Sequence, residues 1–152
     1  MFPFDIHWQT VWSNLILMGA AYALALPIGW NRELHDRSAG LRTFPLVALA
    51  TCGFMLVGMD VLEGSAAQSR TLEGIITGMG FIGGGAILKQ SRRVSGTATA
   101  ASLWSTGAIG IAVAWQRLEI AISIALMTFA TLQLVPSVKA KLETDEHDAD
   151  RE

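Results

Sequence analysis

Two glycine-rich apolar stretches, separated by a short basic segment, constrain this chain more than any other feature of its 152 residues. The first covers residues 70–88 and the second covers residues 96–115. Each is about long enough to cross a bilayer as a helix. Small residues let the backbones of membrane helices approach closely, so the pattern predicts tightly packed helices rather than simple apolar anchors.

In the first stretch, polar and small residues recur every three or four positions and therefore share one helix face. This face is formed by Arg70, Glu73, Thr77, Gly80 and Gly84. An adjoining face carries a small-xxx-small pair, Gly74 and Gly78. The second stretch has its own stripe of small residues at four-residue spacing, formed by Ala98, Ser102, Thr106 and Gly110. We expect these stripes to contact neighbouring helices, with Gly84 facing a packed helix and Ala125 facing lipid.

Three consecutive glycines, residues 83–85, leave two interpretations open. Glycine raises the conformational entropy that a segment loses when it becomes helical. The triplet either permits close helix packing or breaks the helix and exposes its carbonyls to a polar cavity, as in discontinuous transporter helices.

Composition favours a membrane protein of one domain. Hydrophobic residues make up 51% of the chain and charged residues 16%, whereas soluble domains carry about 25% charged residues. The net charge of −2 and the lack of a basic stripe argue against nucleic-acid binding. A single cysteine, Cys52, excludes an intrachain disulfide and a cysteine metal site.

Five apolar spans are expected, at residues 11–30, 44–59, 70–88, 96–115 and 118–135. If the loops alternate sides, nine of the 11 basic residues fall on one side and only Arg70 and Arg117 on the other. Basic loops stay in the cytoplasm. The fold class is therefore an all-α, polytopic membrane helix bundle of about five transmembrane helices, with the N-terminus outside and the C-terminus cytoplasmic. Residues 1–138 form the transmembrane domain, and residues 139–152 form a charged cytoplasmic tail that is helical at first and then disordered.

Four blocks in this order resemble the MgtC/SapB family of bacterial inner-membrane proteins. They read Gly-Trp-Asn-Arg-Glu at 29–33, Ala-Gly-Leu-Arg-Thr at 39–43, Thr-Gly-Met-Gly-Phe-Ile-Gly-Gly-Gly-Ala at 77–86, and Gly-Thr-Ala-Thr-Ala-Ala-Ser-Leu-Trp-Ser-Thr-Gly-Ala-Ile-Gly at 96–110. The resemblance implies a multi-pass protein of the bacterial inner membrane, in a virulence-associated family linked to magnesium homeostasis and growth in low magnesium. It does not imply a settled biochemical activity.

The candidate helix-packing or functional positions lie in these blocks and in the first glycine-rich stretch. They are Arg32, Glu33, Gly40, Arg42, Arg70, Thr77, Gly78, Gly80, Gly83, Gly84, Gly85, Gly96, Thr97, Trp104 and Gly110. The chain departs from the family pattern at Trp30 and Asn31, where Leu and Glu are typical, so one carboxylate of an acidic cluster is missing. Longer members carry a soluble C-terminal domain, and we interpret this chain, with its short acidic tail, as a short form.

Glu73 and Asp60 are the candidate metal ligands, because Mg²⁺ binds one or two carboxylates and keeps several waters. The alternative is that Glu73 pairs with Arg70 at i,i+3 and simply ends a helix. No resident cofactor is expected, and Mg²⁺ is the candidate ion.

Three function classes remain. The first is a membrane regulator that acts by helix–helix contact, with membrane lipid around it and another inner-membrane protein or a homo-oligomer as its partner. The second is a transporter or channel component for a cation such as Mg²⁺. The third is a membrane enzyme, which we do not expect because the sequence shows no catalytic constellation.

Overall fold

The computed structural model describes residues 6–35, 39–90 and 93–149, which form five helices and one short β-hairpin. The helices are α1 (Trp8–Leu34), α2 (Thr43–Val61), α3 (Ser65–Gly85), α4 (Thr97–Ala114) and α5 (Leu118–Ala149). The all-α class and the five helices expected from the sequence are confirmed. Most of the expected tail, residues 139–152, lies in the last part of α5.

Four segments are long and apolar enough to cross a membrane: α1, α2, α4 and the Leu118–Pro136 part of α5. Helix α3 has a similar length of 21 residues, but glycine and charged residues take the place of large apolar ones. It begins at Ser65 rather than at the expected residue 70, so Arg70 and Glu73 lie within the helix and not at its end.

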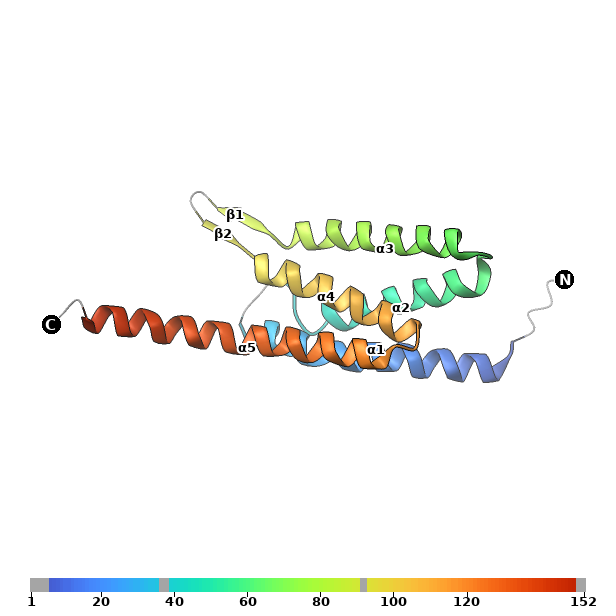
Figure 1. The fold of residues 1–152 in the computed structure, drawn as a ribbon, viewed down its shortest axis with the longest axis horizontal. Helices are drawn as coiled ribbons and strands as arrows, with labels where there is room; N and C mark the ends of the chain where they lie inside the picture. The colour runs from blue at the N-terminus through green and yellow to red at the C-terminus, as the bar shows by residue number, and fades with distance from the viewer. Residues whose placement is uncertain (1–5, 36–38, 91–92, 150–152) are drawn as a thin grey trace.

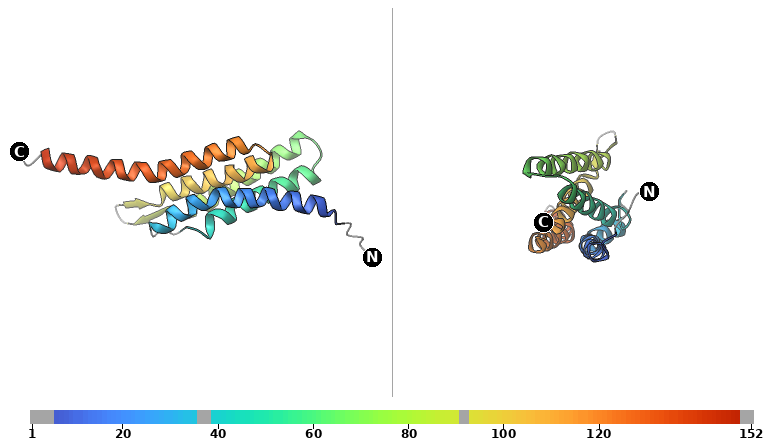
Figure 2. Two further views of the ribbon diagram at one scale, coloured as in Figure 1. Left: turned by 90° about the horizontal axis from the view of Figure 1, so that it is seen from below. Right: turned by 90° about the vertical axis from the view of Figure 1, so that its right-hand side faces the viewer.

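Successive helices run in alternating directions, and α4 occupies the middle of the bundle (Figure 1). It contacts α1, α2, α3 and α5. Helix α3 lies at the margin, as the end-on view in Figure 2 shows, and makes its main contacts with α2 and α4. One side of α3 is therefore left without a neighbour in the single chain.

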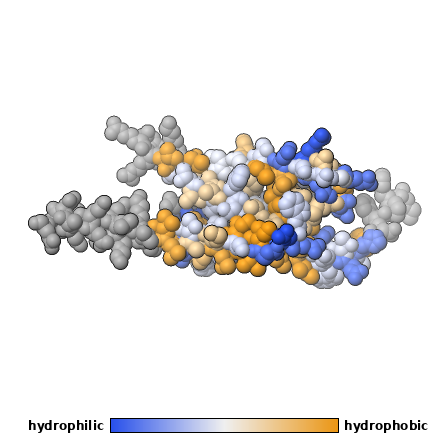
Figure 3. All heavy atoms as spheres, in the orientation of Figure 1, coloured by the Kyte–Doolittle hydropathy of each residue, from blue (hydrophilic) through white to orange (hydrophobic). Residues whose placement is uncertain are grey.

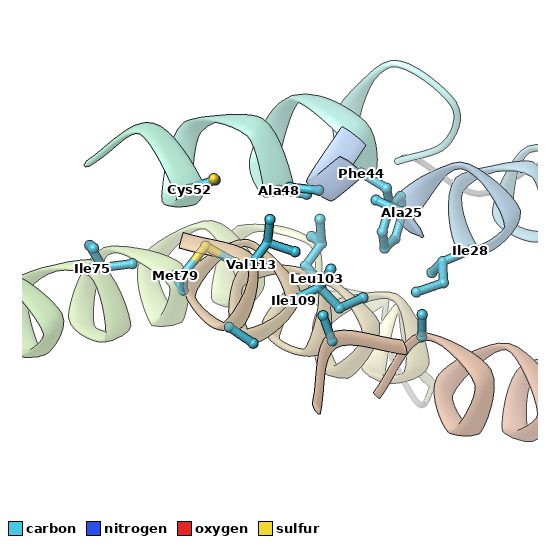
Figure 4. Packing of buried hydrophobic residues seen from close by; sticks show 14 of the residues in the cluster. Ala25, Ile28, Phe44, Ala48, Cys52, Ile75, Met79, Leu103, Ile109 and Val113 are labelled. Carbon is cyan, nitrogen blue, oxygen red and sulfur yellow. The ribbon is translucent and has the colours of Figure 1, made fainter. Parts of the chain in front are cut away.

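The hydrophobic core lies where α4 meets α1 and α2 (Figure 4). Phe44 and Cys52 of α2 and Leu103, Ile109 and Val113 of α4 are all fully buried there. Small residues between these side chains allow the helices to approach closely, as the sequence predicted.

The basic connector at residues 89–95 contributes to a hairpin. Strands β1 (Leu88–Gln90) and β2 (Arg93–Ser95) pair in antiparallel register, with Lys89 opposite Val94. Gly96 then turns the chain into α4 with a φ of 86°, and a Cβ there would overlap the carbonyl oxygen of Ala86. This position requires glycine both for its left-handed backbone and for its lack of a side chain.

The glycine triplet at residues 83–85 does not interrupt α3. The helix continues to Gly85, and the N–H groups of Ala86 and Ile87 then donate to the carbonyls of Gly83 and Gly84, respectively. The triplet is the last turn of the helix, which resolves the two interpretations in favour of an unbroken helix.

Candidate functional site

The polar stripe of α3 points away from the rest of the chain. Arg70, Glu73, Thr77 and Gly84 are all exposed, whereas the opposite side of the helix is buried against its neighbours. Figure 3 shows hydrophilic side chains along the outer edge of the molecule, over the N-terminal half of α3. We call this surface, formed by Arg70, Glu73, Thr77, Gly80 and Gly84, the outer α3 face.

The inner side of α3 is held by close contacts with α4. A Cβ built on Gly83 would lie 3.4 Å from the carbonyl oxygen of Ala100. A Cβ built on Gly107 would lie 2.9 Å from Cε of Met79, so this methionine fills the space that Gly107 leaves open. These contacts fix the rotation of α3 about its axis and thereby direct its polar stripe outward.

The expected environments of Gly84 and Ala125 are reversed in the single chain. Nothing lies within 4 Å of a Cβ built on Gly84 or on Gly85, whereas Ala125 is buried, with 8% of its surface exposed. A Cβ on Gly80 would approach only Nε1 of Trp104, at 4.0 Å. The expectation that Gly84 packs on a neighbouring helix of the same chain was therefore wrong, because Gly83 takes that role.

The alternative interpretation, an i,i+3 ion pair between Arg70 and Glu73, is not met, because no such pair is formed among the described residues. Thr77 Oγ1 donates a 2.8 Å hydrogen bond to the backbone carbonyl of Glu73, not to its carboxylate. Both charged groups therefore remain available on the outer α3 face.

The two candidate metal ligands, Glu73 and Asp60, are both exposed. Within the ranges that the structure describes, no group of three or more His, Cys, Asp or Glu residues could hold a metal ion. An ion at either carboxylate would take its remaining ligands from water or from a partner molecule.

An apolar groove of about 710 Å³ lies between α2 and α3. Gly74 and Gly78 line it on the α3 side, and Thr51, Phe54 and Gly58 line it on the α2 side. Its lining is almost entirely carbon, which suits acyl chains or an apolar helix rather than an ion. A second apolar hollow, lined by Trp104, lies on the other side of α3.

A polar cluster lies at the C-terminal end of α1. Asn31 and Arg32 are 2% and 5% exposed, although both are polar. Nε of Arg32 donates to Oδ1 of Asn31 at 3.2 Å, and Nδ2 of Asn31 donates to Oε1 of Gln133 in α5 at 2.8 Å. The cluster therefore joins α1 to α5 through side chains.

Glu33 and Gly40 fit together at the turn between α1 and α2. Oε2 of Glu33 accepts a 3.1 Å hydrogen bond from the backbone N–H of Leu41, and a Cβ on Gly40 would overlap that carboxylate. Arg42 follows as an exposed residue directly before α2. The lack of a side chain at Gly40 thus leaves room for the Glu33 carboxylate to accept the hydrogen bond from Leu41.

Arg32 also lines a polar hollow of about 260 Å³ beside the start of α4. Its other walls come from β2, from Gly96 and from the first residues of α4, including Thr97. The hollow brings together two blocks of the sequence that are more than sixty residues apart, 29–33 and 96–110.

Comparison with known proteins then decides the family, because the family model described as MgtC family matches residues 18–141 of this chain. This chain belongs to the MgtC family. It is 34% identical over 104 residues to Protein MgtC of Brucella abortus, covering 68% of this chain and 43% of the relative. It is 39% identical over 105 residues to Protein SrpB of Synechococcus elongatus, covering 59% and 58%.

A third relative is YhiD of Escherichia coli K12, which is named as a candidate magnesium transporter. It is 34% identical over 122 residues, covering 76% of this chain and 57% of YhiD. The chain spans about half the length of the curated relatives it matches. No solved structure gives a significant match.

Within this MgtC-family chain, Gly110 permits a close approach of α4 to α2. A Cβ there would overlap Oγ1 of Thr51 and the carbonyl oxygen of Ala48, both in α2. Ser102 and Thr106 in α4 are buried and donate their hydroxyls to backbone carbonyls of their own helix. Three of the four residues of the small stripe in the second glycine-rich stretch, Ser102, Thr106 and Gly110, are therefore packed as expected, whereas Ala98 is exposed.

Two functional relationships escaped the sequence analysis. Asn31 was noted only as a missing carboxylate, whereas it links Arg32 and Gln133. The available signal was an amide near the C-terminal end of α1 and the amide of Gln133 in the apolar part of α5, since side-chain amides in membrane proteins hydrogen-bond across helices. Gly107 was not singled out either, although it accommodates Met79.

Proposed function

We propose that this chain is a bacterial inner-membrane protein linked to magnesium homeostasis and to adaptation to low magnesium, and that it acts as a regulator through helix–helix contacts. The observation that carries the proposal is the outer α3 face, which is polar and glycine-rich and is uncovered in the single chain. The names of the relatives, YhiD above all, support the link to magnesium.

The position of Glu73 supports a protein partner at the outer α3 face. Glu73 comes eight residues after the first residue of α3, which corresponds to roughly 12 Å along the helix. A carboxylate at that depth is costly when it faces hydrocarbon. A neighbouring helix that supplies a polar group and packs on Gly80 and Gly84 would remove this cost.

The charge distribution supports the proposed orientation. The C-terminal end of α1, the hairpin and the C-terminal end of α5 lie at one end of the molecule (Figure 1). The sequence places most of its basic residues in these segments, and basic loops remain cytoplasmic. We therefore assign this end to the cytoplasm and the N-terminus to the opposite side of the inner membrane.

The test is growth in low magnesium of a strain that lacks the gene and carries a variant copy. Gly84→Leu fills the outer α3 face and should abolish complementation. Gly19→Leu is the matched control, because Gly19 is also exposed and has nothing within 4 Å of its Cβ position, but lies on α1. Equal growth of the two strains at equal membrane abundance would contradict the proposal.

The alternative is a transporter or channel component for a cation such as Mg²⁺, and the name of YhiD is the observation that favours it. Proteoliposomes that enclose a magnesium-sensitive dye would then show an influx that Glu73→Gln abolishes. Absence of flux with the wild-type chain, combined with loss of growth for Gly84→Leu, would leave the regulatory function standing.

A further inference from the structure

We infer that the outer α3 face binds a second copy of this chain, in a parallel dimer in which Arg70 of each copy pairs with Glu73 of the other. This inference rests on the proposed function, since it names the partner of the same surface. The two residues lie on one helix face, are exposed, and form no ion pair with any residue that the structure describes.

The charges on this face are self-complementary under twofold symmetry. A symmetric dimer brings the same patch of both copies together, so that residue i meets residue j and residue j meets residue i. Copies inserted with the same topology place their α3 helices parallel. Arg70 and Glu73 are three residues apart, about 4.5 Å along the axis, and the long arginine side chain can cover this rise. Two reciprocal pairs then form.

Gly80 and Gly84 supply the close approach that such a dimer needs. They form a GxxxG motif on the outer α3 face, and parallel membrane helices pack closely through this motif. No atom lies within 4 Å of a Cβ on Gly84, and only Trp104 reaches that distance from Gly80. The neighbouring GxxxG-like pair, Gly74 and Gly78, faces the α2 groove instead.

Lipid alone does not suit this surface. Acyl chains would leave the carboxylate of Glu73 without a polar partner inside the hydrocarbon. A second copy provides the guanidinium of Arg70 at a matching depth and the same glycines for packing. The outer α3 face of one copy therefore offers the guanidinium, the carboxylate and the glycines that the same face of the other copy requires.

The first test is disulfide cross-linking of the full chain in native membranes. Thr77→Cys places a thiol in the middle of the outer α3 face, and Ala130→Cys places one on α5. Both residues are exposed, and both lie twelve positions after the first residue of helices that start at the same end. Both variants carry Cys52→Ala, which removes the natural thiol.

A covalent dimer should form with Thr77→Cys and not with Ala130→Cys. Failure of Thr77→Cys to cross-link to itself would overturn the inference, and so would its cross-linking to a different membrane protein instead. Equal cross-linking of both variants would overturn it as well, because random collision would then explain the product.

The second test exchanges the charges in the Thr77→Cys background. Arg70→Glu and Glu73→Arg each place like charges across the interface and should reduce the cross-linked fraction of inserted protein about tenfold. The double variant restores opposite charges and should recover to within about twofold of the starting level. If the cross-linked fraction of the double variant stays more than about twofold below the starting level, the reciprocal pairing is wrong.

Co-expression of the two single variants separates a second copy from any other partner. A chain with Arg70→Glu has two acidic groups and a chain with Glu73→Arg has two basic groups, so the mixed dimer pairs both. Differently tagged copies should therefore cross-link to each other at least about tenfold more than either does to itself. If mixed and self cross-linking are equal, the inference fails.

The growth assay distinguishes this inference from the proposed function. If Gly84→Leu abolishes growth in low magnesium while no dimer is ever trapped, the function stands and the second copy is wrong. If the dimer forms and Gly84→Leu breaks it without affecting growth, the dimer stands and the proposed function is wrong.

Discussion

Asn31 Nδ2 lies 2.8 Å from Oε1 of Gln133, and this hydrogen bond joins α1 to α5 across 102 residues of sequence. The same asparagine accepts hydrogen bonds from Nε and Nη2 of Arg32 through its own Oδ1. Arg32 is buried beside the start of α4. One amide therefore positions a buried guanidinium and connects the first helix to the last.

Removal of this link should lower stability in a non-additive way. Asn31→Leu and Gln133→Leu each remove one partner and should cost about 1 to 3 kcal/mol of unfolding free energy. Their double-mutant cycle should yield a coupling of roughly 0.6 to 1.7 kcal/mol, the range for membrane hydrogen bonds. Thermal unfolding in detergent measures each term, and strictly additive losses would show that the two amides act independently.

Gly40→Ala should disturb the turn between α1 and α2 through Glu33. The new methyl group would overlap the Glu33 carboxylate, which must then release the N–H of Leu41, at a cost of about 1 kcal/mol. In a Glu33→Ala background the same substitution should cost much less, because the overlapping group is gone. An equal loss in both backgrounds, measured by unfolding in detergent, would assign the effect to the backbone instead.

Substitution of two adjacent glycines at the end of α3 by leucine should affect stability very differently. Gly83→Leu would push against the backbone of Ala100 in α4 and should cost about 1 to 3 kcal/mol. Gly84→Leu meets open space and should change the stability of the monomer by less than about 0.5 kcal/mol. Melting temperatures in detergent at low protein concentration provide the measurement, and a matching decrease for both would place Gly84 in a packed contact.

Gly110→Ala should be one of the most disruptive single-methyl changes in the core. The added carbon would overlap Thr51 Oγ1 and the backbone carbonyl of Ala48, and overpacking of this kind costs roughly 1 to 3 kcal/mol. Gly19→Ala adds the same methyl to an exposed position of α1 with free space around it and should leave stability unchanged or raise it. Comparable destabilisation by both would refute a specific contact between α2 and α4.

The two ends of the bundle should label from opposite sides of the membrane. In a Cys52→Ala background, Ser65→Cys at the start of α3 should react with an impermeant maleimide added to intact cells. Val94→Cys in the hairpin should react only after the inner membrane is opened. Both positions are exposed, so the maleimide can reach them. Labelling of Val94→Cys in intact cells and of Ser65→Cys only after opening would contradict the proposed orientation.

The helices were predictable because long apolar runs alternate with short polar connectors. The boundaries of α3 were not, since Arg70 and Glu73 suggested the edge of a span. The helix extends past them to Ser65, and both charged residues lie on its exposed side, where their side chains need not be buried. The hairpin also escaped prediction, because its three-residue strands are too short for a detectable period.

The composition of the outer α3 face was predicted correctly, but its direction was not. Spacing shows which residues share a side of a helix and does not show which neighbour that side meets. In this chain the direction depends on two long-range contacts, Gly83 with Ala100 and Met79 with Gly107. Likewise, no local pattern connects Asn31 with Gln133.

The odd number of helices, each reversing the direction of the one before, has a consequence for what can be attached to this chain. The start of α1 and the end of α5 lie at opposite ends of the molecule (Figure 1). If the helices cross the membrane as proposed, any polypeptide that continues beyond α5 would share a compartment with the hairpin and with the C-terminal end of α1. A reporter or domain joined there could sense or signal on that side alone, while one placed before α1 would sample the other compartment.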